Sequence, residues 1–222
     1  MIAVDGPAGS GKSSAARGVA QRLGLRYLDT GAIYRALTWW LMSQHADITD
    51  ERLVASRAAE PVIEVSSDPD DPWTRVDGRD VSEQIRTREV SAQVSTVASV
   101  PEVRRHLISL QRAVIAAAAQ PGIVAEGRDI GTVVAPDAQL KVFLTAHSQA
   151  RAKRRAAEQG AAVDVTEADQ DRRDRLDAAQ SAKAADAVLL DATDLTLPEV
   201  INAITRLARE RAPLARAGGK SR

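Results

Sequence analysis

The fold follows from the stretch Gly6-Pro7-Ala8-Gly9-Ser10-Gly11-Lys12-Ser13, which has the residue spacing of a phosphate-binding loop. The residues before it, Ile2–Asp5, predict a short buried strand. Small and apolar residues then recur at helical spacing, which predicts a helix over Lys12–Leu23. This motif binds phosphate when it forms the turn between a strand and a helix. The stretch therefore predicts a nucleotide-binding α/β fold.

The glycines of this loop let successive backbone N–H groups turn inward, where they form an anion site with the N-terminus of the following helix. We expect Lys12 to reach the β- and γ-phosphates of ATP. We expect the Ser13 hydroxyl to bind a Mg²⁺ ion whose other ligands are water and phosphate oxygens. A purely structural glycine turn is the alternative. The predicted ATP-binding residues are Gly6, Pro7, Ala8, Gly9, Ser10, Gly11, Lys12, Ser13 and Ser14.

The composition is that of an ordinary soluble domain. The chain has 222 residues, of which 44 % are apolar and 27 % are charged, and its formal net charge is zero. A neutral chain argues against a surface devoted to nucleic acid or to an anionic membrane. The absence of cysteine excludes disulfides, thiolate metal sites and thiol nucleophiles. The longest apolar run, residues 113–119, is too short to span a bilayer, and we expect a cytoplasmic protein.

The rest of the chain alternates between strand and helix patterns. Short apolar runs at residues 123–125, 140–144 and 187–190 predict strands, and longer helical patterns cover residues 103–119 and 197–209. Alternation of this kind predicts a parallel β-sheet with helices on both faces.

Two segments depart from this alternation. Residues 61–81 have apolar positions at a period of two and a turn at Asp77-Gly78, which predicts a small β insertion. We interpret its acidic part, residues 66–72, as a solvated hairpin loop rather than a metal site. Residues 159–162 lie between basic runs and predict the hinge of a lid, although two ordinary solvated helix faces are the alternative.

Two further motifs predict a second group of functional residues. Thr30 and Arg35 fall in the first and second turns of a predicted helix, where a plain helix cap is the alternative role for Thr30. Glu126-Gly127-Arg128-Asp129 directly follows a predicted strand, and ligands of parallel sheets bind at the carboxyl ends of strands. An exposed ion pair is the alternative for this cluster.

Taken together, the motifs resemble those of bacterial cytidylate kinases over most of the chain. They are the phosphate loop, Leu28-Asp29-Thr30-Gly31-Ala32-Ile33-Tyr34-Arg35, Ile85-Arg86-Thr87-Arg88-Glu89-Val90, Glu126-Gly127-Arg128-Asp129-Ile130-Gly131-Thr132-Val133-Val134 and Arg172-Arg173-Asp174-Arg175-Leu176-Asp177. The resemblance implies phosphoryl transfer from ATP to CMP or dCMP, giving ADP and CDP or dCDP, in pyrimidine nucleotide metabolism.

The resemblance also implies the domain organisation and the partners. A single domain, residues 1–222, would consist of a core (1–60, 89–147 and 166–222), a monophosphate-side insertion (61–88) and a helical lid (148–165). The partners would be ATP with Mg²⁺, and CMP or dCMP. We expect a monomer with no nucleic-acid or membrane partner.

The site residues implied by the resemblance form two overlapping sets. The CMP-binding set is Thr30, Arg35, Ser95, Arg104, Arg128, Asp129, Arg173 and Asp177. Within it, Arg35, Arg128 and Arg173 would bind phosphate; Ser95, Arg104 and Asp129 would recognise the base; and Asp177 would bind the sugar. The catalytic set is Lys12, Arg128, Arg155 and Arg173.

The chemistry of the reaction agrees with these sets. An acceptor phosphate is already anionic at neutral pH, so no dedicated base is needed, and His45, His106 and His147 have no expected role. The reaction instead needs cations that hold two polyanions and stabilise developing charge. A lid carrying Arg151, Arg154 and Arg155 would also exclude water as a competing acceptor.

One position departs from the family pattern. Most relatives have an arginine three residues after the position of Asp177, where this chain has Gln180, and the stretch that follows is shortened. Lys183, in a neighbouring turn, is the candidate replacement for the missing cation, although a lysine offers a point charge rather than a bidentate fork. The alternatives left open are a kinase for UMP, AMP or shikimate, and a catalytically weakened nucleotide-binding regulatory module.

Overall fold

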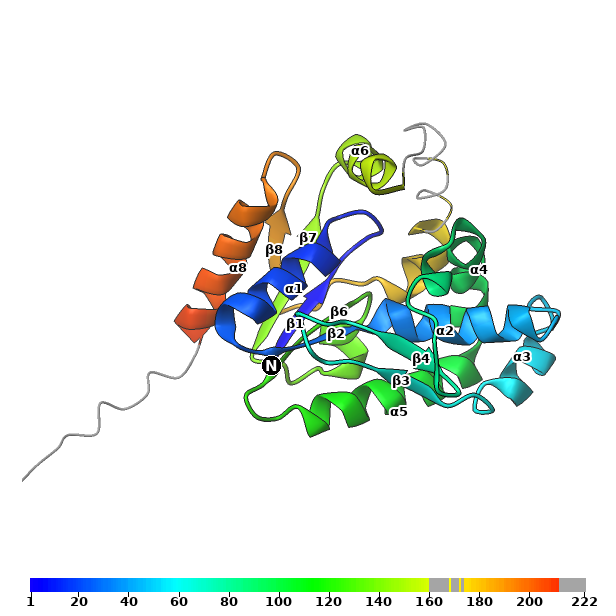
Figure 1. Ribbon diagram of the computed structural model, residues 1–222. Helices are drawn as coiled ribbons and strands as arrows, with labels where there is room; N and C mark the ends of the chain where they lie inside the picture. Colours follow the sequence, from blue (N-terminus) through cyan, green and yellow to red (C-terminus); the bar gives the residue numbers. More distant parts are fainter. Residues whose placement is uncertain (160–167, 169–171, 173, 212–222) are drawn as a thin grey trace, which may run out of the picture.

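The computed structural model describes residues 1–159, 168, 172 and 174–211. Its main sheet has five strands in the order β2-β6-β1-β7-β8, and every neighbouring pair is parallel (Figure 1). The strands are β1 (Ile2–Asp5), β2 (Arg26–Asp29), β6 (Ile123–Gly127), β7 (Leu140–Thr145) and β8 (Val188–Asp191). The predicted parallel sheet is confirmed, and the predicted strands lie within a few residues of the observed ones.

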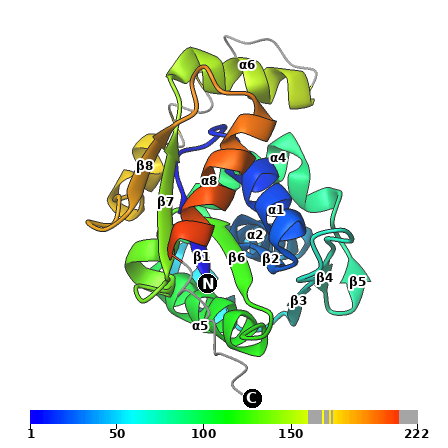
Figure 2. The same ribbon diagram turned by 90° about the vertical axis from the view of Figure 1, so that its left-hand side faces the viewer.

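Helices cover both faces of this sheet (Figures 1 and 2). They are α1 (Lys12–Leu23), α2 (Thr30–Ser43), α3 (Glu51–Arg57), α4 (Arg88–Ala98), α5 (Pro101–Ala117), α6 (Ser148–Gln159) and α8 (Leu197–Arg211). Buried residues of α1 and α8 pack on one face, and those of α2 and α5 pack on the other. No helix in the described part of the chain combines the length and the apolar character needed to cross a membrane.

Strand β1 shows why the sheet needs two layers of helices. Its side chains alternate between the faces, as in any strand, so Ile2 and Val4 pack with α1 and α8 whereas Ala3 packs with α2. All four residues of the strand are buried. A strand that is apolar on both sides is typical of a parallel sheet covered on both faces.

The predicted β insertion is a three-stranded antiparallel sheet in the order β3-β4-β5, formed by Ile63–Val65, Thr74–Val76 and Arg79–Asp80. Its tight turn lies at Asp77 and Gly78, which both have positive φ, as the Asp-Gly pair predicts. The loop between β3 and β4 rests on α1, because Arg17 and Gln21 donate to the backbone carbonyl of Pro69. It is therefore a hairpin loop anchored to the core.

The strands β1, β2 and β6 end side by side. Asp5 is paired with Gly127, and Asp29 is paired with Glu126. The buried Asp5 carboxylate accepts hydrogen bonds of 2.8 Å from the backbone N–H groups of Ile130 and Gly131, in a π-helical turn (Ile130–Val134). Burial raises the pKa of Asp5. This carboxylate fixes the segment after β6, which carries Arg128 and Asp129, against the start of the phosphate loop.

We predict that Asp5→Ala lowers the free energy of unfolding by about 2–5 kcal/mol, because two buried N–H groups lose their acceptor. Urea unfolding measures this change. Asp80→Ala is the control, because Asp80 also accepts a hydrogen bond from a backbone N–H, that of Ser82, but is exposed. The free energy of unfolding of this variant should stay near that of the wild type. An Asp5→Ala variant as stable as the control would contradict the role given to Asp5.

Candidate active site

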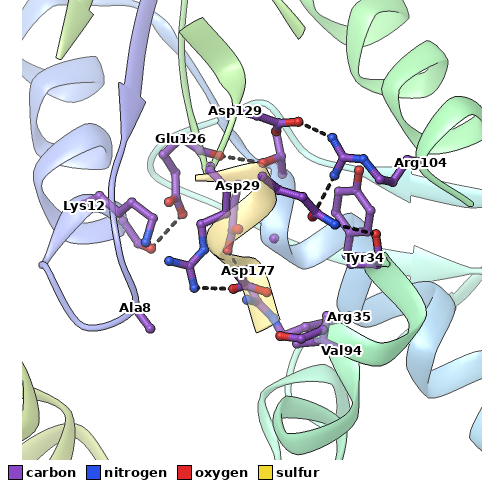
Figure 3. A pocket seen from close by; sticks show the side chains of 18 of the residues that line it. Ala8, Lys12, Asp29, Tyr34, Arg35, Val94, Arg104, Glu126, Asp129 and Asp177 are labelled. Atoms are coloured by element: carbon purple, nitrogen blue, oxygen red, sulfur yellow. Dashed lines mark hydrogen bonds and ion pairs between the residues drawn. The ribbon is translucent and has the colours of Figure 1, made fainter. Parts of the chain in front are cut away.

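A cavity opens at the carboxyl ends of the strands, between the phosphate loop, α2, α4 and α5 (Figure 3). It brings together most of the residues predicted for the site. Those that line it are Ala8, Gly9, Lys12, Ser13, Thr30, Arg35, Ser95, Arg104, Arg128, Asp129 and Asp177. The other residues predicted to bind ATP do not line it: Gly6, Pro7, Ser10 and Gly11 belong to the loop, and Ser14 lies in the first turn of α1. Arg173 and the side chain of Arg155 lie outside the described residues.

The phosphate loop has a backbone that requires glycine. A Cβ atom on Gly6 would lie 2.1 Å from the backbone carbonyl oxygen of Leu144. Gly9 and Gly11 have φ angles of 72° and 88°, in the left-handed region that favours glycine. Gly11 is also the residue that precedes the first turn of α1. The Lys12 ammonium donates to the Pro7 carbonyl at 3.0 Å and so lies over the loop.

Three polar side chains meet beside the loop. The Ser13 hydroxyl donates to Glu126 Oε1 at 2.6 Å, and Glu126 is buried next to Asp29 (Figure 3). Burial and the negative charge of Asp29 raise the pKa of Glu126 to about 7. Burial alone would also raise the pKa of Asp29, but the positive charges of Arg35 and Arg86 outweigh it and lower that pKa. The two carboxyl groups therefore differ in their affinity for a proton.

Thr30 is not the cap of its helix, so that alternative is wrong. The N-cap of α2 is Asp29, whose carboxylate accepts the Ala32 N–H at 2.9 Å. Thr30 Oγ1 instead donates to the Glu126 carbonyl at 2.7 Å. A Cβ atom on Gly127 would lie 2.6 Å from Thr30 Oγ1, so this glycine allows α2 to approach the end of β6. Thr30 thus joins the two motifs at the floor of the cavity.

The arginines of the cavity are held by acidic side chains. Arg35 pairs with Asp29 at 2.8 Å, and Arg128 pairs with Asp177 at 2.8 Å. Arg128 also donates to the Gly6 carbonyl at 3.1 Å, so it reaches the phosphate loop.

A third pair lies at the opposite wall, where Arg104 donates to Asp129 (Figure 3). Arg128 is 18 % exposed and Asp129 is 8 % exposed, so the alternative of an exposed ion pair does not describe this cluster.

Some polar atoms in the cavity wall have no protein partner. Ser95 Oγ and Arg35 Nε are buried without a hydrogen bond. Buried polar atoms are normally hydrogen-bonded, so these two are available to a polar ligand. Tyr34 lines the same wall, and burial raises the pKa of its hydroxyl to about 12. Tyr34 was not among the predicted residues, although it lies one helical turn after Thr30 in the same motif.

Two of the arginines predicted for a lid contact the loop backbone. Helix α6 lies across the carboxyl ends of the strands (Figure 2). Arg151 donates to the Ala8 carbonyl at 2.9 Å and pairs with Asp174 at 2.6 Å. Arg154 donates to the carbonyls of Ser10 and Ala192. Neither side chain lines the cavity, so both brace the loop in this structure.

Lys183 does not replace the missing cation, and that prediction is wrong. Its ammonium donates to the carbonyls of Ala184 and Ala187, both at 3.3 Å, and it does not line the cavity. Gln180 itself lines the cavity, where Arg104 donates to its side-chain oxygen. The three histidines also lie outside the cavity lining.

A family model and several known proteins are similar to this chain over nearly its whole length. A family model described as cytidylate kinase matches residues 2–210. The cytidylate kinase of Streptomyces avermitilis is 50 % identical over 95 % of this chain and 93 % of its own length. That of Streptomyces coelicolor is 51 % identical over the same shares.

Among solved structures, an uncharacterized protein from Eubacterium ventriosum covers 94 % of this chain and 97 % of its own, with a TM-score of 0.51 and 11 % identity. It shares the fold.

The pKa of Glu126 predicts a pH dependence of stability. A carboxyl group whose pKa is higher in the folded than in the unfolded state stabilises the fold at low pH, and this contribution is lost as the pH rises through the folded pKa. Relative to Glu126→Gln, the wild type should lose about 3 kcal/mol of unfolding free energy between its ordinary pKa of 4.5 and about pH 7.

Urea unfolding of both proteins at several pH values measures this loss, with Glu64→Gln at an exposed position as the control. If the difference in unfolding free energy between the wild type and Glu126→Gln stayed constant over this pH range, the raised pKa of Glu126 would be contradicted.

Proposed function

The chain belongs to the cytidylate kinase family and transfers a phosphoryl group from ATP to CMP or dCMP, and we propose that the cavity at the carboxyl end of its sheet is where both nucleotides meet. One observation carries this proposal. The phosphate loop and three half-buried arginines surround the same cavity, with Arg128 reaching from the loop carbonyl of Gly6 to Asp177. Two polyanions brought together need such a concentration of positive charge.

On the donor side, we propose that the loop and the N-terminus of α1 bind the ATP phosphates. The glycine φ angles give the loop the inward-facing backbone that an anion site requires. Lys12 would exchange its contact with the Pro7 carbonyl for the β- and γ-phosphate oxygens.

The oxygen atoms beside the loop suit a Mg²⁺ ion. Ser13 Oγ lies 2.6 Å from a Glu126 carboxylate oxygen, and Mg²⁺ prefers oxygen ligands while keeping several waters. Within the described ranges, no group of three or more His, Cys, Asp or Glu side chains could hold a metal. We therefore propose Ser13 as the protein ligand of an ion bound chiefly by ATP phosphates. Such an ion offsets phosphate charge when bound.

On the acceptor side, we propose that Arg35 and Arg128 bind the CMP phosphate, together with Arg173. In this structure Asp29 pairs with Arg35 and Asp177 pairs with Arg128. A bound phosphate would replace part of each ion pair, because its oxygens would accept hydrogen bonds from the two guanidinium groups. Asp177 is then free to accept a sugar hydroxyl. The acceptor oxygen is already anionic, so the arginines need only align it and stabilise the transferring group.

We propose that the Arg104–Asp129 pair recognises cytosine. The pair presents a donor and an acceptor side by side. Cytosine carries an amino donor at N4 beside the acceptors N3 and O2, so a carboxylate can accept from N4 while a guanidinium donates to the acceptors. Uracil has an acceptor at that position, which would face the Asp129 carboxylate. The unpartnered Ser95 hydroxyl supplies one further contact to the base.

The remaining predictions are part of the same proposal. We propose that residues 148–165 close over the nucleotides as a lid, with Arg155 reaching the transferring phosphate, and that residues 61–88 form the monophosphate-side insertion of a single domain. The predictions of a monomer, of a cytoplasmic location, and of no nucleic-acid or membrane partner stay predictions. No observation favours a kinase for UMP, AMP or shikimate, or a weakened regulatory module.

We predict rapid ADP formation from Mg-ATP with CMP and dCMP and slow formation with UMP and AMP. Lys12→Ala and Arg128→Ala should each lower kcat by about 10²–10³-fold, because each removes a cation from the transferring phosphate. Arg155→Ala should lose CMP phosphorylation and keep ATP binding.

Arg105→Ala is the matched control, since Arg105 is exposed and outside the cavity, and it should keep wild-type turnover. Measurable nucleotide binding without acceptor-dependent ADP formation would contradict the proposed site chemistry.

A further inference from the structure

Gln180 is a cavity residue to which the proposed function gives no role. It ends a short 3-10 turn, η3 (Ala178–Gln180), that begins directly after Asp177. Its side-chain oxygen accepts from Arg104 Nη1 at 2.9 Å, and its side-chain nitrogen donates to the Ala98 carbonyl at 3.3 Å. The residue therefore touches α4 and α5 as well as the cavity.

These two contacts fix the orientation of the Gln180 amide. Ala98 is the last residue of α4, where carbonyl groups have no partner within the helix and need a donor. Only the NH₂ group of the amide can satisfy that carbonyl, and only its oxygen can accept from Arg104. A flipped amide would place donor against donor and acceptor against acceptor. The oxygen of Gln180 is thus held toward Arg104.

The same contact fixes Arg104. One terminal nitrogen of its guanidinium donates to Asp129 and the other donates to Gln180. A planar guanidinium held at both terminal nitrogens cannot rotate out of its plane without losing one bond. With Asp129 as the sole acceptor, the group could turn about that single ion pair. Arg104 is 19 % exposed, so water competes only weakly for the contact.

A neutral acceptor suits position 180 of this chain, because a side chain without an acceptor could not bind Arg104. A carboxylate would draw Arg104 away from Asp129 and add negative charge near the acceptor atoms of cytosine. The amide of Gln180 binds Arg104 and leaves the charges of the Arg104–Asp129 pair unchanged.

We propose that Gln180 is a positioning residue for base recognition, which acts by holding Arg104 so that the Arg104–Asp129 pair faces cytosine. This proposal rests on the proposed function, because it assumes that this pair reads the base. A residue that only caps α4 would affect stability and would leave the choice of base unchanged.

The test uses Gln180→Met, which keeps the length of the side chain and removes the acceptor. With saturating Mg-ATP, kcat and KM are measured for CMP and UMP. We expect the ratio of kcat/KM for CMP over UMP to fall about tenfold, mainly through a higher KM for CMP, with an unchanged KM for ATP. Gln180→Leu, which also lacks an acceptor, should show the same loss, and Gln139→Met at an exposed position should show none.

A double-mutant cycle separates positioning from a structural role. In an Arg104→Ala background, Gln180→Met should cause no further loss of discrimination, because Gln180 acts through Arg104. An equal loss in both backgrounds, or a wild-type ratio in Gln180→Met, would overturn the positioning role while the proposed function stands. A wild type that does not prefer CMP would overturn the proposed function and this inference with it.

Discussion

Strand β6 pairs in parallel with β1 on one side and with β2 on the other, and the arrangement of the site depends on this pairing. Parallel strands end at the same edge of a sheet, so the register places Asp29 beside Glu126 and Asp5 beside Gly127. Each strand continues into a segment of the proposed site, namely the phosphate loop, α2 and the turn after β6. Asp5 then binds two N–H groups of that turn and prevents the segments from separating.

Charge balance is the second constraint on the cavity. A site for two polyanions needs several arginines close together, and without ligands these would repel one another. Asp29, Asp129 and Asp177 each hold one of them in an ion pair that is mostly shielded from water. Such pairs add little to stability, since desolvation offsets their attraction. In the proposed site, these pairs keep each guanidinium oriented before a nucleotide arrives.

The parts of the fold and site that could be predicted from the sequence depend on local patterns. The phosphate loop, β1 and α1 occupy the predicted residues, because glycine spacing and helical periodicity are properties of neighbouring residues. The contact of Gln180 with Arg104 could not be predicted, since the two residues are 76 positions apart in the sequence. Lys183 was predicted wrongly because the turn that follows it points its ammonium at the carbonyls of Ala184 and Ala187. From the sequence, Thr30 could be either the cap of its helix or a residue of the site, and the structure shows that Asp29 is the cap.

The most direct measurement is a crystal structure of the protein with CMP and a non-hydrolysable ATP analogue. We expect cytosine against Arg104 and Asp129, the CMP phosphate on Arg35 and Arg128, and the analogue's phosphates in the loop at Lys12. Another cavity lies between α1 and the β insertion and is lined by Arg17, Trp73 and Arg86. CMP bound there instead would contradict the central claim that one arginine-lined cavity holds both nucleotides.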